Sequence, residues 1–298
     1  MPYLPEALAS LEAQSFRDFE VILWDNGSTD GGVEEAQRWI PTRLPGRVVT
    51  TCPLPLHECL ARMVEESCTE FCARMDADDV CLPGRLQRQM DEFTSDVELA
   101  ALGSQAEFVD AGGSRTGGHS EFPLEFCDIL SGMLVENQLL HPSIMFRRQA
   151  VLDAGNYAIA KPCEDYDLWL RVALQGRLRN LSERLLLYRI HPNSILASAR
   201  SARQLEEPNL RCIEAHSELI FGVPAMVYRQ LRRKERLLSC LPLARAALRI
   251  ACRADVSPLR VLRSPSFLWS ARCLTCKSDL VSRAVWGAVQ RLPLPGSP

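Results

Sequence analysis

The chain has 298 residues, of which 47% are apolar and 24% are charged. This composition is typical of a folded globular protein and excludes a wholly disordered chain, a collagen-like chain or one continuous coiled coil. The charge is unevenly divided: residues 1–200 hold 18 Lys and Arg against 30 Asp and Glu (net −12), and residues 201–298 hold 16 against 7 (net +9). An acidic body followed by a basic tail predicts two regions with different tasks.

Strands and helices alternate along the first 200 residues. Helices are expected where apolar residues recur at helical spacing, over 4–16, about 30–40, 56–67, 83–93 and 163–175. Strands are expected in short apolar runs, over 19–24, 47–51, 70–75, 99–110, 139–147 and 184–190. The glycine-rich segment 112–118 is expected to be a flexible connector. The alternation predicts an α/β fold with a mainly parallel, twisted sheet flanked by helices, and helices rich in Arg and Leu from about residue 200.

Membrane-spanning and targeting segments are not expected. The most apolar stretch, 237–252, is shorter than the roughly 20 residues that a span requires, and one proline and two arginines interrupt it. The first ten residues lack the features of a signal peptide. We therefore expect a cytoplasmic location, or a peripheral one on the inner face of the cell membrane, with free thiols. Cys273 and Cys276 form a single CxxC pair, which favours buried thiols over a zinc site.

Acidic side chains gather where predicted strands end. Asp76, Asp78 and Asp79 follow the strand at 70–75, and ligands of such sheets bind beyond the carboxyl ends of strands. Clustered carboxylates favour Mg²⁺ or Mn²⁺ completed by a substrate phosphate. The alternative is a solvated turn in which Asp79 caps the next helix. Asp25 also follows a strand, where it can contact a nucleoside or simply cap a turn.

Three other places hold candidate groups. Glu164 and Asp165 open a predicted helix, where they either stabilise the helix start or provide a general base. His141 is expected to be a hydrogen-bonded structural residue. His191 follows Arg189 at a strand end, so it has the better claim to a phosphate or metal. Phosphate-binding P-loop, dinucleotide-binding and serine-hydrolase motifs are absent from the sequence.

Five segments carry a recognisable pattern in this order: SLEAQSFRDFEVILWDNGSTD, ARMDADDVCLPGRLQRQ, LLHPSIMFRR, CEDYDLWLR and LLLYRIHPNS. Taken together, they resemble the family 2 glycosyltransferases of the GT-A fold. Together they cover roughly residues 4–195. The resemblance implies a GT-A sheet with a Rossmann-like nucleotide-binding half over 1–205, followed by a basic helical extension over 206–298.

The resemblance also implies roles for individual residues. Asp25 matches the acidic residue that contacts the nucleotide base. Asp76 and Asp78 match the DxD carboxylates, the first facing the ribose and the second holding Mg²⁺ or Mn²⁺. Asp165, with Glu164 beside it, matches the catalytic base of the xED motif. In the motif that reads tyrosine, arginine, any residue, histidine, Arg189 is assigned to the nucleotide sugar and His191 to the metal or diphosphate.

These roles imply an inverting transfer from a nucleotide-diphosphate sugar to a saccharide or lipid-linked acceptor, of the kind that builds polysaccharides. One departure is that family members begin with an apolar strand that this sequence lacks before its first helix, so we expect the natural start to lie upstream. The alternative function is a non-catalytic sugar-nucleotide-binding or scaffold protein, and a metal-dependent phosphohydrolase is a more distant one. Arginines alternate with apolar residues over 228–291, which favours contact with anionic lipid. The alternative is a helical appendage whose arginines are solvated. Nucleic-acid binding is less expected, because the acidic body repels phosphate.

Overall fold

The structure is a computed structural model that describes residues 2–159, 163–192, 202–232 and 240–275. The chain forms two compact units. The first contains residues 1–122 and 139–201, and the second contains residues 123–138 and 202–298. The segment 123–138 therefore belongs to the mainly C-terminal unit, although the sequence alone placed it within the first domain.

The first unit begins with a small parallel ribbon of two strands and its helices. Its elements are α1 (Leu4–Glu12), β1 (Val21–Asp25), α2 (Gly32–Trp39), β2 (Gly46–Thr50) and α3 (Leu56–Glu66). β1 pairs with β2 from Val21 opposite Gly46 to Asp25 opposite Thr50. A Cβ at Gly46 would lie 2.0 Å from the Val21 carbonyl oxygen, so this close approach requires glycine. Leu4 and Leu8 of α1 pack with Trp39 into a core that also contacts both strands.

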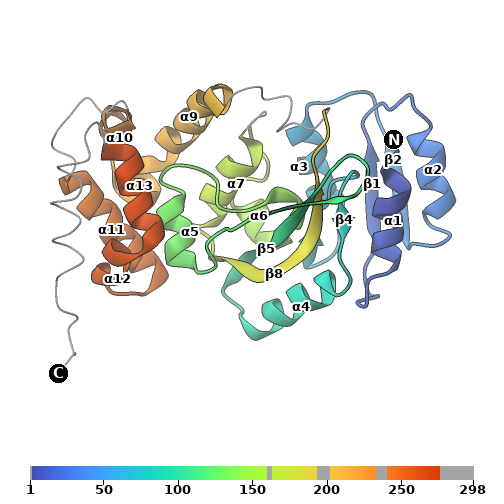
Figure 1. The fold of residues 1–298 in the computed structure, drawn as a ribbon, viewed down its shortest axis with the longest axis horizontal. Helices are drawn as coiled ribbons and strands as arrows, with labels where there is room; N and C mark the ends of the chain where they lie inside the picture. The colour runs from blue at the N-terminus through green and yellow to red at the C-terminus, as the bar shows by residue number, and fades with distance from the viewer. Residues whose placement is uncertain (1, 160–162, 193–201, 233–239, 276–298) are drawn as a thin grey trace. The chain divides into compact units, whose positions relative to one another are not determined.

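The second sheet has six strands. Its order is β3 (Phe71–Ala73), β7 (Met145–Arg147), β5 (Leu99–Val109), β8 (Arg177–Arg189) and β4 (Val80–Cys81), and β6 (Arg115–His119) pairs with β5. β5 and β8 are parallel, and the other pairs of this sheet are antiparallel. Figure 1 shows β5 and β8 as two long strands curving side by side. The structure thus confirms the expected α/β class. The larger sheet is mixed, with one parallel pair and four antiparallel pairs among the described strands, where the sequence predicted mainly parallel strands.

Two segments differ from the sequence-based expectation. The glycine-rich segment is not a connector, because residues 115–119 form β6 in a hairpin with β5. The Asp110 side chain accepts hydrogen bonds from the Gly112 and Ser114 N–H groups (both 2.9 Å) and so builds the turn. The stretch at 139–147 is only partly extended, because a 3₁₀ turn, His141–Ser143, precedes β7.

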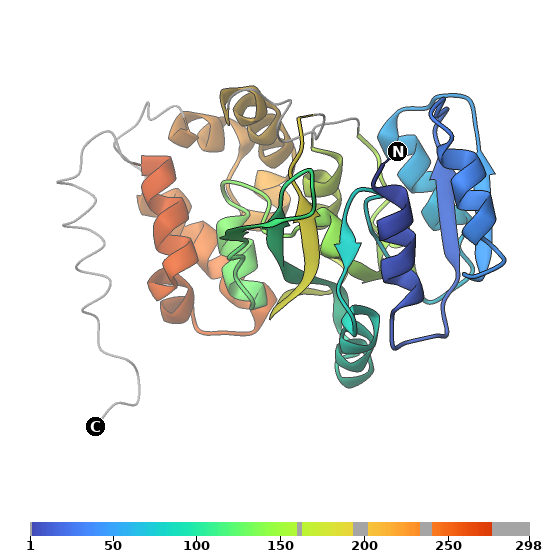
Figure 2. The same ribbon diagram turned by 45° about the vertical axis from the view of Figure 1, so that its right-hand side comes forward.

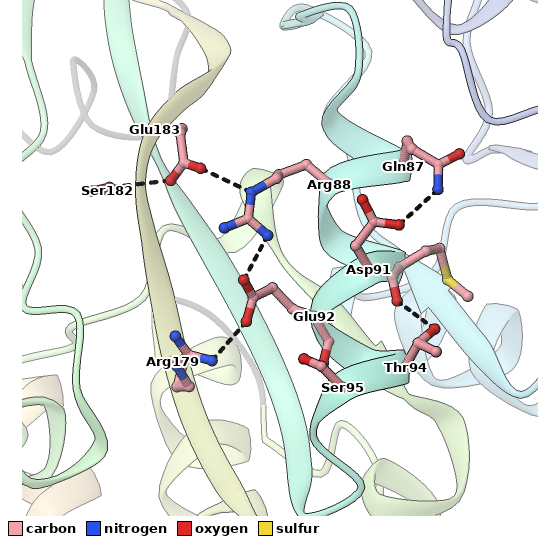
Figure 3. A network of polar contacts seen from close by, with 10 residues as sticks. Gln87, Arg88, Asp91, Glu92, Thr94, Ser95, Arg179, Ser182 and Glu183 are labelled. Carbon is pink, nitrogen blue, oxygen red and sulfur yellow. Dashed lines mark hydrogen bonds and ion pairs between the residues drawn. The ribbon is translucent and has the colours of Figure 1, made fainter.

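An ion-pair network joins α4 (Arg85–Ser95) to β8 (Figure 3). Arg88 donates to Glu183 at 2.8 Å and to Glu92 at 2.5 Å, and Arg179 donates to Glu92 at 2.7 Å. An isolated surface ion pair contributes at most about 1 kcal/mol to stability. Here the Glu92 carboxylate accepts from both Arg88 and Arg179, so it links α4 to β8. The network joins the helix that follows the aspartate cluster to the strand that carries Arg189. α6 (Arg148–Asp153) and α7 (Glu164–Val172) complete the described helices of this unit.

The second unit is helical. It contains α5 (Phe126–Gly132), α9 (Ala202–Phe221), α10 (Ala225–Arg232), α11 (Cys240–Ala254), α12 (Pro258–Arg263) and α13 (Pro265–Thr275). Both ribbon views show α5 among the later helices (Figure 2). The Tyr228 hydroxyl donates to the Leu134 carbonyl (2.5 Å) and the Ser270 hydroxyl donates to the Ser131 carbonyl (2.6 Å). These bonds attach 123–138 to the C-terminal helices.

No helix in the described ranges combines the length and apolar character needed to cross a bilayer. Cys273 is half-buried, and Cys276 lies outside the described residues. The basic residues at 233–236 and the apolar residues at 285–286 also lie outside them.

Candidate active site

Three aspartates meet in the turn between β3 and β4. One carboxylate oxygen from each of Asp76, Asp78 and Asp79 lies within 4.8 Å of the other two. The Asp79 N–H donates to the Asp76 carbonyl at 3.3 Å, which holds the turn together. Asp76 and Asp78 are half-buried, whereas Asp79 is only 1% exposed. Such a set of oxygen ligands can hold a divalent cation.

Asp79 contributes a buried carboxylate to this cluster. Its Oδ1 accepts a hydrogen bond from the Arg189 N–H (2.9 Å), but its buried Oδ2 has no hydrogen-bond partner among the described residues. Burial, with the neighbouring charges of Asp76 and Asp78, raises the pKa of Asp79 to about 8. A cation would satisfy the orphaned oxygen, so the residues present fit a metal. Asp79 does not cap the next helix, since Gly84 occupies the N-cap position of α4.

Arg74, directly after β3, holds Asp76 in a two-point ion pair. Its Nη1 donates to Asp76 Oδ2 at 2.7 Å and its Nη2 contacts Asp76 Oδ1. The Arg74 N–H also donates to the Ile144 carbonyl (2.8 Å) and so fixes the backbone at the start of the turn. A bidentate pair of this kind orients a carboxylate. Sequence reasoning missed Arg74, although its place two residues before Asp76 at a strand end was a usable signal.

Glu164 and Asp165 form the first turn of α7. Asp165 Oδ1 accepts a hydrogen bond from the Tyr166 N–H at 2.8 Å. Burial, followed by the negative charge of Glu164, raises the pKa of Asp165 to about 6. Glu164 is buried, and its Oε2 has no hydrogen-bond partner among the residues that the structure describes. A carboxylate with a pKa this close to neutrality suits proton transfer.

The charge of Arg74 acts on both groups of carboxylates. It lowers the pKa of Asp165 and that of Asp79, and in each case it opposes the larger effect of burial. One guanidinium therefore lies within electrostatic reach of the aspartate cluster and of the α7 carboxylate. Arg74 contacts the cluster directly through Asp76, and its charge also acts on the α7 carboxylate.

The end of β8 lies against the aspartate cluster. His191 Nε2 is 2.9 Å from Asp78 Oδ2, and the His191 ring packs against Tyr3 with centroids 5.1 Å apart. The buried Arg189 side chain donates to the Asp78 carbonyl (2.7 Å), the Asp110 carbonyl (3.3 Å) and Glu6 (2.6 Å). The Arg189 guanidinium is therefore engaged within the protein, and its assignment to the nucleotide sugar stays a prediction.

Replacing Arg189 by methionine should show whether this side chain stabilises the fold or binds the nucleotide sugar. Two partly buried carbonyl groups and the Glu6 carboxylate would lose their donor, so we expect the free energy of unfolding to fall by about 1 kcal/mol or more. Chemical denaturation measures this change. A variant of wild-type stability that binds the donor more weakly would instead assign Arg189 to the nucleotide sugar. The exposed Arg38, which pairs with Glu35 on one helix, provides the control Arg38→Met.

Asp25 ends β1 and lies in the other sheet. Its carboxylate accepts hydrogen bonds from the Gly27 N–H (3.1 Å) and the Ser28 N–H (3.2 Å), as in an Asx turn. Within the described ranges, no hydrogen bond or ion pair joins Asp25 to the aspartate cluster. His141 is buried and hydrogen-bonded to the Tyr157 hydroxyl (2.7 Å), and burial and Arg74 hold its pKa well below the usual value. His141 is thus structural, as expected.

Comparison with known proteins identifies the family. The family model for glycosyl transferase family 2 matches residues 1–153, about half of the chain. The O-antigen biosynthesis glycosyltransferase WbnJ of Escherichia coli is 31% identical over 220 residues, which cover 70% of this chain and 83% of WbnJ. This protein is a family 2 glycosyltransferase.

A further relative and two solved structures are also similar to this family 2 glycosyltransferase. The amylovoran biosynthesis glycosyltransferase AmsE of Erwinia amylovora is 32% identical over 193 residues, 62% of this chain and 70% of AmsE. Residues 1–349 of TarS from S. aureus, solved with UDP-GlcNAc, align with a TM-score of 0.60 at 17% identity, covering 97% of this chain and 86% of that one. The mannosyltransferase PcManGT of Pyrobaculum calidifontis, solved with GDP-Man and Mn²⁺, aligns with a TM-score of 0.53 at 15% identity, covering 98% and 84%. These neighbours confirm the expected GT-A fold.

Proposed function

We propose that this glycosyltransferase moves a sugar from a nucleoside-diphosphate sugar to an acceptor hydroxyl with inversion at the anomeric carbon. The relatives named for amylovoran and O-antigen biosynthesis support a role in building a cell-surface polysaccharide or glycolipid. The structural neighbours solved with UDP-GlcNAc and GDP-Man support a nucleotide-sugar donor.

Asp165 is the proposed general base. It takes the proton of the acceptor hydroxyl as that oxygen forms a bond to the anomeric carbon. The bond between the anomeric carbon and the diphosphate oxygen breaks, and its electron pair leaves with the nucleoside diphosphate. The pKa of about 6 supports this role, because the carboxylate is ionised at neutral pH yet keeps affinity for a proton. Glu164 raises that pKa through its own negative charge.

The aspartate cluster is the proposed metal site. Asp78 and the orphaned Oδ2 of Asp79 would hold Mg²⁺ or Mn²⁺, while Arg74 holds Asp76 for the donor ribose. A bound cation would neutralise the charge that develops on the departing diphosphate. His191, hydrogen-bonded to Asp78, is proposed to orient that carboxylate or to reach the metal or diphosphate. Asp25 is proposed to contact the donor base.

Arg74→Gln should shift the pH dependence of transfer. The positive charge of Arg74 lowers the pKa of Asp165, so removing it should raise that pKa. We expect the acidic break in kcat/KM, near pH 6 in the parent enzyme, to move to higher pH. Steady-state rates between pH 5 and pH 9 measure this shift. Arg74→Lys keeps the charge and serves as control, and an unchanged break in Arg74→Gln would contradict the coupling.

The aspartate cluster, with Asp76 paired to Arg74 and the charge of Arg74 also acting on Asp165, supports the proposal. Its test is incubation of the enzyme with Mn²⁺ and a panel of UDP and GDP sugars. Release of nucleoside diphosphate, with NMR showing the opposite anomeric configuration in the product, is expected. Release of free phosphate would identify a phosphohydrolase, and a retained configuration would exclude a single displacement.

A further inference from the structure

The exposed face of α11 carries an apolar row. Leu241, Leu248 and Cys252 follow one another at spacings of seven and four residues, so they lie on one side of the helix. Leu241 is 66% exposed and Leu248 is 52% exposed. The opposite side of α11 supplies residues such as Ile250 to the core of the second unit. The row is therefore a second apolar surface, separate from the one that packs the helix.

An arginine row runs beside these leucines. Arg245, Arg249 and Arg253 recur every four residues on α11. Arg253 donates to the Leu219 carbonyl (3.2 Å) at the end of α9, and the Leu219 side chain is 59% exposed. The arginines thus lie between exposed leucines of two helices. We name Leu219, Leu241, Arg245, Leu248, Arg249 and Arg253 the leucine–arginine face.

These arginines have no acidic partner within the described ranges. Neither Arg245, Arg249 nor Arg253 forms an ion pair there, and α10–α13 contain no acidic residue. Burial and the like charge of Arg249 lower the pKa of Arg253. By contrast, Arg211 and Arg229 of the same unit pair with Glu207 (3.2 Å) and Glu214 (2.6 Å). Among the described residues, the guanidinium groups of the face are therefore not engaged in ion pairs.

We infer that the leucine–arginine face binds an anionic lipid bilayer. Arginines attract anionic headgroups, and their apolar stems lie along the interface while the exposed leucines enter the acyl boundary. Nucleic acid would bind the arginines but would leave the leucines in contact with water, so it would not explain why the leucines are exposed. The net charge of +9 over residues 201–298 favours the same partner.

Cosedimentation of the full chain with vesicles tests this inference. We expect binding to vesicles of equal parts phosphatidylcholine and phosphatidylglycerol, and little binding to phosphatidylcholine alone. Arg245→Gln/Arg249→Gln should weaken partitioning by about tenfold or more, since each cation near the surface contributes roughly a factor of five. Arg211→Gln/Arg229→Gln removes the same charge from ion-paired sites and should leave at least most of the binding intact.

A third variant examines the apolar half of the face. Leu241→Ser/Leu248→Ser should also weaken binding, although the charge is unchanged. Circular dichroism of each variant checks that the helices are retained. The inference is overturned if the full chain ignores anionic vesicles, or if both arginine pairs weaken binding equally. It is also overturned if the leucine variant binds normally while duplex DNA competes fully with vesicles, which would indicate a nucleic-acid surface.

Discussion

Asp165→Asn is expected to slow glycosyl transfer at least about 10²-fold and to leave donor affinity unchanged. Asparagine retains a carbonyl oxygen that can accept the Tyr166 N–H, so the start of α7 should stay intact. It has no basic oxygen to take the acceptor proton. Single-turnover rates and calorimetric titration with the donor measure the two quantities separately. Asp153→Asn changes an exposed carboxylate at the end of α6 and is the matched control.

The pH dependence supplies an independent check on Asp165. Its pKa in the folded enzyme is about 6, above the ordinary 3.8, so kcat/KM should fall as the pH drops below about 6. The folded state binds this proton more tightly than the unfolded chain. The stability that the group contributes is therefore lost as the pH rises from about 4 to about 6. Asp165→Asn should remove that loss, and a near-normal turnover in this variant would exclude Asp165 as the base.

Asp78→Ala and Asp79→Asn are expected to abolish metal-dependent binding of the nucleotide. Both variants remove a carboxylate ligand from the proposed cation site, while the amide oxygen introduced by Asp79→Asn can still accept the Arg189 N–H. Calorimetric titration with UDP or GDP, with and without Mn²⁺, measures the effect. In the parent enzyme we expect Mn²⁺ to strengthen binding, and in each variant the two titrations should coincide.

The control for the metal prediction is Asp91→Asn. Asp91 lies on α4 and accepts a hydrogen bond from Gln87 (2.8 Å), outside the cluster. Nucleotide binding by this variant should depend on Mn²⁺ as in the parent enzyme. Unchanged metal dependence in Asp79→Asn would show that the orphaned oxygen is not a ligand, and the proposed cation site would then rest on Asp78 with His191.

Features set by short segments were predictable from the sequence. The aspartates stand next to a recognisable apolar strand, and α7 begins where its first acidic residues indicated. The burial of Asp79 was not predictable, because this side chain lies against the end of β8. There it accepts the N–H of Arg189, 110 residues further along the chain. The role of Arg74 was hidden for the same reason, since its charge matters only once α7 has packed nearby.

Long-range packing also explains where the structure departs from the sequence-based expectation. Residues 115–119 contain two glycines, which alone disfavour a strand, but pairing with β5 supplies the hydrogen bonds that local propensity lacks. α5 looked like part of the first domain because it precedes β7 in the chain. The hydroxyl groups of Tyr228 and Ser270, which bond to carbonyls of this segment, lie 94 and 139 residues further along the chain, and no local pattern encodes these bonds.

The β1–β2 ribbon has a consequence for how a nucleotide would be held. Its two strands share one five-residue ladder and, within the described residues, join no larger sheet. A short ladder of this kind opens at a lower free energy than long strands such as β5 and β8. Hydrogen exchange should therefore be faster in β1 than in β5. Asp25 terminates β1, so part of the free energy of nucleotide binding there would be used to order this ladder. Bound nucleotide should therefore slow hydrogen exchange most at the β1 and β2 amides.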